Sequence, residues 1–138
     1  IGASNMKLFK SGAVLKIGPI RQMTFQEWCV EGIVTPFYGG NGQGDHRFWT
    51  LMQVVGITVA IEARKSYVNY PKAFVKRIVE AIGGMEEEEL LKLFKAGKTH
   101  FYGTVSAPNG PIPVFDKPVY DFMVDTKAIY ERVKAYER

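Results

Sequence analysis

The chain has 138 residues, of which 46% are hydrophobic and 23% are charged, a composition typical of one folded domain or of a small domain with an appendage. Its single cysteine, Cys29, excludes an intramolecular disulfide and a zinc site built from several cysteines. No run approaches the roughly 18 apolar residues that a membrane helix needs, and no apolar run follows the first basic residue. We therefore expect a cytoplasmic protein with no membrane segment.

Net positive charge is larger in the first half of the chain than in the second. Residues 1–66 contain seven Lys or Arg and four Asp or Glu, whereas residues 67–138 contain eleven and ten, which together make the net charge of +4. A mildly basic first half is compatible with a polyanionic partner, although a committed nucleic-acid binder often carries more positive charge.

The first predicted unit is helix, turn, helix. Apolar spacing predicts a short helix over residues 11–17, which "GP" at Gly18 then breaks. A second helix is expected to begin at Thr24, because Thr24 and Glu27 have the spacing of a capping box. Gly32 is expected to end this helix in the left-handed conformation.

A hairpin and a buried helix are expected next. Residues 33–38 favour an extended path, "GGNGQG" is a turn, and "HRFW" returns antiparallel to the first strand. Thr50 and Gln53 form a second potential capping box. It would open a helix of about four turns ending near Ser66, apolar on most faces and therefore central to a core.

The second half is predicted to contain helix, helix, strand, strand and helix. "PKAFVKRIVEAIGG" carries one apolar stripe, and "MEEEELLKLFKAG" places acids in its first turn and lysines near its end, as the helix dipole favours. "THFYGTVS" and "VYDFMV" are expected strands joined by a turn, and Asp125 would cap the final helix. We expect an α+β protein with an N-terminal extension at 1–10, a winged helix-turn-helix at 11–68 and a small α+β appendage at 69–138.

Three interpretations compete for the glycine-rich stretch. A nucleotide-binding loop is disfavoured, because "GGNGQG" lacks the terminal Lys-Ser/Thr of a P-loop and does not join a buried strand directly to a helix. A plain surface turn remains open. The third interpretation is a wing, a hairpin that lies along a phosphate backbone while the preceding helix enters the major groove.

The stretch from Ser11 to about Lys65 resembles the DNA-binding domain of the MerR family of transcription regulators. The family pattern I-G-x-L-A-x-L-x-G-V-S-x-x-T resembles "SGAVLKIGPIRQMT", L-R-x-[YW]-[ED]-x-x-G-L-[IL] resembles "FQEWCVEGIV", and G-x-[RH]-R-x-[YF]-[ST]-x-x-[DQ]-[VL] resembles "GDHRFWTLMQV". The matching residues are Gly12, Val14, Ile17, Ile20, Thr24, Phe25, Trp28, Glu31, Gly32, Ile33, His46, Arg47, Trp49, Thr50, Gln53 and Val54.

The resemblance implies a sequence-specific contact with double-stranded DNA. It places Arg47 on a phosphate from the wing with His46 beside it, and Gln26 where the family usually has a groove-reading arginine. Lys16 and Arg21 would contact the backbone near the turn. The predicted DNA-binding residues are Lys16, Arg21, Gln22, Gln26, Gln43, His46 and Arg47.

Oligomeric state and the role of the second half stay open. Because the predicted reading helix carries Glu27 and Glu31, we expect a homodimer that adds its contacts on a palindromic site. Residues 69–138 could serve dimerisation or bind a small-molecule or protein effector. The apolar face formed by Ile129, Val133 and Tyr136 could pack internally or against a second copy.

Two other function classes compete with the regulator. One is a protein-interaction module that docks a partner through Phe48, the wing and the acidic helices. The other is a small enzyme with a pocket around His100, Tyr102 and Asp121, although no catalytic or metal-binding motif stands out, and we expect neither enzyme activity nor a cofactor.

Overall fold

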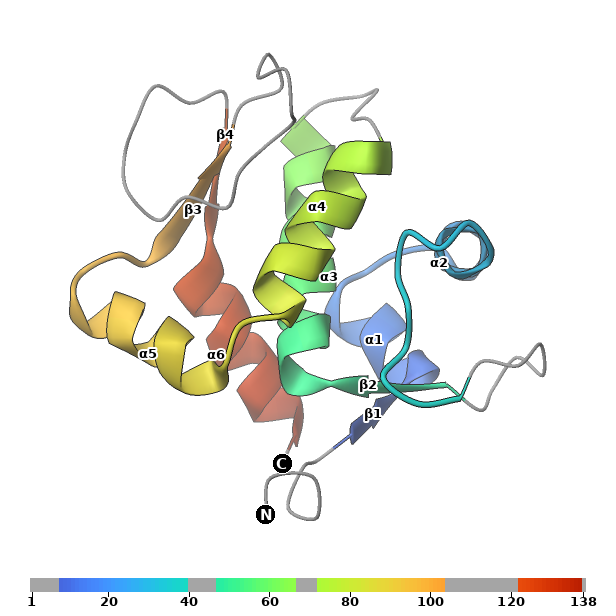
Figure 1. Cartoon of the computed structure of the whole chain (residues 1–138), viewed down its shortest axis with the longest axis horizontal. Coiled ribbons are helices and arrows are strands. Elements are labelled where there is room, and N and C mark those ends of the chain that lie inside the picture. The colour runs from blue at the N-terminus through green and yellow to red at the C-terminus, as the bar shows by residue number, and fades with distance from the viewer. Residues whose placement is uncertain (1–7, 40–46, 67–71, 104–121, 138) are drawn as a thin grey trace.

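The computed structural model describes residues 8–39, 47–66, 72–103 and 122–137, and within them the protein is α+β (Figure 1). Six helices and two small antiparallel sheets are present in these residues. Their order is β1 (Leu8–Lys10), α1 (Ser11–Ile17), α2 (Gln22–Val30), β2 (Phe48–Thr50), α3 (Leu51–Ser66), α4 (Lys72–Gly83), α5 (Glu87–Lys95), β3 (His100–Gly103), β4 (Phe122–Asp125) and α6 (Thr126–Glu137).

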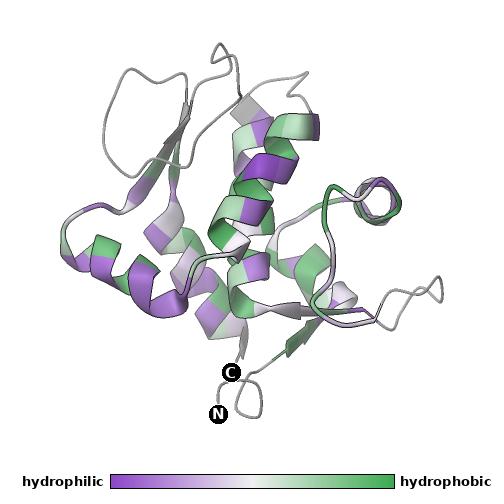
Figure 2. Ribbon diagram, in the orientation of Figure 1, coloured by the Kyte–Doolittle hydropathy of each residue, from purple (hydrophilic) through white to green (hydrophobic). Residues whose placement is uncertain are grey.

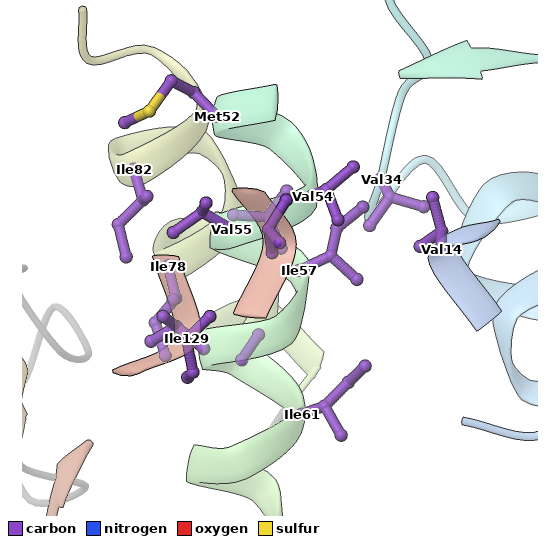
Figure 3. Packing of buried hydrophobic residues seen from close by; sticks show 14 of the residues in the cluster. Val14, Val34, Met52, Val54, Val55, Ile57, Ile61, Ile78, Ile82 and Ile129 are labelled. Atoms are coloured by element: carbon purple, nitrogen blue, oxygen red, sulfur yellow. The ribbon is translucent and has the colours of Figure 1, made fainter. Parts of the chain in front are cut away.

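Helix α3 is the centre of the core, as its apolar sequence predicts. It packs along α4 on one side and contacts α6, β4 and the first sheet on others (Figure 1). In Figure 3, Val54 and Ile57 lie on the side of Val34, while Val55 lies on the side of Ile78. Different elements therefore cover the apolar residues on different faces of α3.

Gly56 allows the close approach of α3 and α4. A Cβ atom built on Gly56 would lie 3.1 Å from the carbonyl oxygen of Val79 and 3.4 Å from the amide nitrogen of Gly83. Because both neighbours are backbone atoms, the helices could not retain this separation with a side chain at that position.

The first sheet joins the N-terminal segment to the strand that precedes α3. Strands β1 and β2 are antiparallel, with Phe9 opposite Trp49, and Tyr38 forms an antiparallel bridge with Phe48 on the other edge of β2. The bridge agrees with the predicted hairpin, whose tip at residues 40–46 lies outside the described residues. Residues 8–10, predicted to belong to an N-terminal extension, form β1, with Phe9 buried in the core.

One predicted capping box is correct and the other is wrong. The amide of Thr50 donates to Gln53 Oε1 at 3.0 Å, and the amide of Gln53 donates to Thr50 Oγ1 at 3.1 Å, as the spacing predicts. Helix α2, however, begins at Gln22 rather than Thr24, with Arg21 as an N-cap that makes no side-chain capping bond. Thr24 already lies inside the helix, so it cannot serve as the cap.

The second half follows the predicted order of elements. Helix α4 buries its apolar stripe, which consists of Val75, Ile78, Val79 and Ile82, with Phe74 partly covered. Strands β3 and β4 pair antiparallel with Phe101 opposite Val124. The amide of Ala128 donates to Asp125 Oδ1 at 3.0 Å, so Asp125 caps α6 as predicted.

Buried residues form one continuous cluster that runs from Phe9 to Val133. Ile129 and Val133 of α6 belong to it, while Tyr136 is 45% exposed, so two of the three residues predicted on that apolar face pack internally. The boundary predicted between residues 68 and 69 lies outside the described residues. None of the helices described combines the length and apolar run needed to cross a bilayer.

Candidate nucleic-acid interface

Two aromatic residues determine which side of α2 faces the protein. Phe25 and Trp28 are each 2% exposed, and the ring centroids of Phe25 and of Trp49 in β2 lie 5.2 Å apart. The guanidinium of Arg64 in α3 lies 5.7 Å from the ring centre of Trp28, within the range of a cation–π contact. The opposite side of α2 is therefore exposed to solvent.

The end of α2 is set by a Schellman motif at Gly32. The amide of Ile33 donates to the carbonyl of Trp28 at 2.9 Å, and the amide of Gly32 donates to that of Cys29 at 3.2 Å. Gly32 has φ +75°, which confirms the predicted left-handed C-terminal residue. The motif turns the chain back so that Ile33 and Val34 enter the core.

The exposed side of α2 combines amide, apolar and acidic side chains. Gln22, Gln26 and Glu27 are exposed, and Met23 and Val30 are 75% and 78% exposed. An open hollow of about 680 Å³ lies over this side and is lined, among the described residues, by Gln22, Met23, Gln26, Glu27, Val30 and Glu31. We call these six residues the α2 outer face.

Exposed positive charges lie at the N-terminal end of α2. Arg21 is its N-cap residue, and Lys16 lies in the last turn of α1; both are exposed. The turn between them presses against α3, because a Cβ on Gly18 would lie 2.8 Å from Ile61 Cδ1 and 3.0 Å from Thr58 Oγ1. Close contact at Gly18 therefore fixes the turn that joins α1, which carries Lys16, to Arg21 at the start of α2.

Arg47 does not occupy the surface position that the resemblance implies. It is only 7% exposed, and its positive charge acts on the thiol of Cys29 in α2. Burial raises the pKa of the Cys29 thiol, and the charge of Arg47 opposes that shift in part. Arg47 thus lies inside the protein behind α2 rather than extending toward a phosphate, since little of it reaches solvent.

Four of the seven predicted DNA-binding residues lie on α2 or on the helix and turn that lead into it. Lys16, Arg21, Gln22 and Gln26 are all exposed. Gln43 and His46 lie outside the described residues. The exposure of Val30 was not predicted, although Val30 avoids the side of the helix that carries Phe25 and Trp28.

The second half shows a histidine–carboxylate contact and a smaller hollow. His100 Nε2 lies 3.9 Å from Asp125 Oδ2, and the Thr99 hydroxyl lies 2.9 Å from His100 Nδ1. Of the residues predicted for an enzyme pocket, Asp121 lies outside the described residues. A hollow of about 290 Å³ is lined by Glu62, Met123, Val124, Asp125, Ala128, Ile129 and Arg132. Within the described part of the chain, no three His, Cys, Asp or Glu side chains gather closely enough to hold a metal ion.

Comparison with protein-family models gives no match, and no curated protein matches the chain. The resemblance to the MerR family therefore rests on the residues quoted from the sequence.

Proposed function

We propose that the protein is a sequence-specific DNA-binding transcription regulator, of a winged helix-turn-helix type, that inserts α2 into the major groove. The observation that supports this most directly is the composition of one helix surface. Gln22 and Gln26 project from α2 while exposed Lys16 and Arg21 flank its N-terminal end. Amide side chains read base edges, and cations beside them neutralise the adjacent phosphates.

The α2 outer face favours A·T base pairs. A glutamine amide matches the N6 and N7 positions of adenine with two hydrogen bonds, and exposed apolar side chains contact the thymine methyl group. Gln22 and Gln26 supply the amides, while Met23 and Val30 supply the apolar contacts. We therefore expect adenine and thymine at the positions that α2 reads.

The backbone contacts are assigned to Lys16, Arg21 and the wing tip. Gln43 and His46 keep the wing role that the resemblance implies. Arg47 is given a different role, because its burial beside Cys29 suits support of α2. The aliphatic stem of an arginine contributes packing at such a position.

A homodimer on a palindromic site completes this proposal. In one copy we assign two cations, Lys16 and Arg21, to the approach to α2, and Glu27 and Glu31 lie on the outer face, so a second copy would double the phosphate contacts. Two-fold symmetry would place the half-sites about 10 base pairs apart, or a multiple of that spacing. We place this regulator in the cytoplasm, without a cofactor, and leave residues 69–138 open to an effector.

A second candidate function is docking of a protein partner on the same face. Met23 and Val30 are among the most exposed large apolar residues described, and both line the hollow over α2 with Glu27 and Glu31. An apolar side chain flanked by basic residues would fit this surface. This candidate requires neither Lys16 nor Arg21.

A binding series with variants of exposed residues tests the regulator against the docking module. Duplexes selected from a random pool are titrated by fluorescence anisotropy against the wild type, Gln26→Ala and Arg21→Gln. We expect Gln26→Ala to lose about 1–3 kcal/mol of discrimination at one base pair, and Arg21→Gln to weaken binding to all sequences and reduce the salt slope by about one. Lys95→Gln on α5 removes the same charge elsewhere and should behave as wild type. Absence of salt-dependent binding by the wild type would refute the regulator and leave the docking module.

A further inference from the structure

The smaller hollow lies where α3, β4 and α6 meet, and it shares no lining residue with the α2 outer face. Helix α3 contacts both β4 and α6, and β4 leads directly into α6 (Figure 1). The volume of about 290 Å³ is just below the lower limit usual for sites that bind drug-sized molecules. The hollow therefore suits a ligand smaller than a drug molecule.

Buried apolar side chains form the floor of this hollow. Val124 of β4 and Ile129 of α6 are 5% and 4% exposed, and Met123, which is 53% exposed, also lines it. Helix α6 carries hydrophobic and hydrophilic bands in turn (Figure 2). Ala128 adds only a methyl group to the lining, so this position leaves space that a larger side chain would fill. An aliphatic group of a ligand can therefore be buried against the floor.

Charged groups of both signs surround the apolar floor. Glu62 of α3 and Asp125 of β4 contribute carboxylates, and Arg132 of α6 contributes a guanidinium. Side chains of a helix lean toward its N-terminus, so Arg132 leans back over Ala128 in the direction of Asp125. Arg132 is exposed, and no described residue forms a hydrogen bond or ion pair with it. Its guanidinium is therefore available to an anionic group.

The two carboxylates keep part of their accepting capacity. Glu62 Oε2 accepts from Lys65 Nζ at 3.1 Å, and Asp125 Oδ1 accepts from the amide of Ala128 at 3.0 Å. Asp125 Oδ2 lies 3.9 Å from His100 Nε2, which is longer than a hydrogen bond. Because each carboxylate oxygen has two lone pairs, both groups can accept from a further N–H donor.

We propose that this hollow binds a free aliphatic α-amino acid. The ligand carboxylate would pair with Arg132, whose guanidinium presents parallel N–H donors to such a group. The ligand ammonium would donate to Glu62 and Asp125, and the aliphatic side chain would cover Val124 and Ile129. This inference goes beyond DNA binding and does not depend on it, because no lining residue lies on α2.

Three ligands that share one carbon skeleton test the proposal. Leucine carries both charged groups, isocaproate lacks the amine, and isoamylamine lacks the carboxylate. Binding to the full chain is measured by calorimetry and by amide NMR shifts at neutral pH. We expect leucine to bind and each analogue to bind about tenfold more weakly, because each loses a hydrogen-bonded contact between charged groups. The largest shifts should fall on β4 and the first two turns of α6.

Variants of the lining distinguish recognition from a change in folding. Arg132→Gln should weaken leucine about tenfold and leave the binding of isoamylamine unchanged, because the amine does not use Arg132. Asp125→Asn retains a side chain that caps helices, and it should weaken leucine but not isocaproate. Ala128→Leu fills the hollow and should abolish leucine binding. Ala135→Leu is the matched control, because Ala135 is an exposed residue of α6 outside the lining.

Two kinds of result would overturn the inference. One is failure of leucine to bind, or equal binding of leucine and isocaproate, since the amine would then play no part. The other is leucine binding that neither Arg132→Gln nor Ala128→Leu alters while circular dichroism shows both variants folded. None of these results concerns the salt dependence of DNA binding by α2, so the two proposals fail separately.

Discussion

Replacement of Gly32 by alanine isolates the energetic cost of one backbone conformation. Gly32 has φ +75°, and a Cβ atom built on it meets no atom of the described residues within 4 Å. Gly32→Ala therefore introduces no steric clash with the described part of the protein. The whole effect on the folded state comes from forcing an alanine into the left-handed region.

The expected magnitude follows from two opposing contributions. A left-handed conformation costs an L-residue roughly 1–2 kcal/mol. Alanine also restricts the unfolded chain more than glycine does, which returns roughly 0.4–1 kcal/mol. We therefore expect Gly32→Ala to lower the free energy of unfolding by about 1 kcal/mol.

Two other glycines make matched controls. Gly97, after α5, has φ +84° and equally open surroundings, so Gly97→Ala should cost about the same. Gly12 lies within α1 and is also open, so Gly12→Ala should stabilise the protein by about 0.5 kcal/mol through helix propensity.

Urea unfolding followed by circular dichroism measures all three variants. With a denaturant dependence of about 2 kcal/mol per molar, Gly32→Ala should lower the midpoint by about 0.5 M and Gly12→Ala should raise it by about half as much. If Gly32→Ala leaves the midpoint unchanged, or if Gly12→Ala lowers it equally, the reasoning from backbone conformation is refuted.

Four further predictions concern helix caps, packing, charge and the thiol. Thr50→Ala removes a formed cap and should cost about 1 kcal/mol in urea unfolding, whereas Thr24→Ala, at the position that is not a cap, should cost nearly nothing. Gly56→Ala should cost about 1–3 kcal/mol in the same assay by pushing α4 from α3, and an unchanged midpoint would contradict the close helix contact. Glu27→Gln should tighten DNA binding at low salt by removing a repulsive charge, and weaker binding would contradict this role. Burial raises the pKa of Cys29, so alkylation by iodoacetamide should rise at higher pH in the folded protein than in urea. For the same reason the free energy of unfolding should fall as pH increases above the thiol pKa of the unfolded chain. Identical alkylation profiles in the folded and unfolded protein would contradict the raised pKa.

Signals confined to a few neighbouring residues were sufficient to predict several elements correctly. The Thr50–Gln53 box, the left-handed Gly32 and the Asp125 cap each involve residues within five positions of one another. Their hydrogen bonds close locally, so residue type and spacing determine them.

Predictions failed where a distant segment decided the outcome. Residues 8–10 form a strand because β2, forty residues later, offers its edge. Arg47 has the sequence context of a wing cation but is buried beside Cys29.

One part of the candidate interface follows from local sequence, and another part depends on a distant segment. The exposed amides of Gln22 and Gln26 follow from the helix period once Phe25 and Trp28 are recognised as the inward side. The ion pair between Glu31 of α2 and Lys72 of α4 could not be predicted, since no local pattern relates residues 41 positions apart.

The sequence alone determined the type and order of most elements, the formed helix caps and the inward side of α2 and α4, because short-range hydrogen bonding and apolar periodicity specify them. Only the tertiary structure decided that β1 joins the core, that Arg47 is buried and that α4 lies beside the end of α2. These features depend on how α3 brings distant segments together, and that packing is a property of the whole chain.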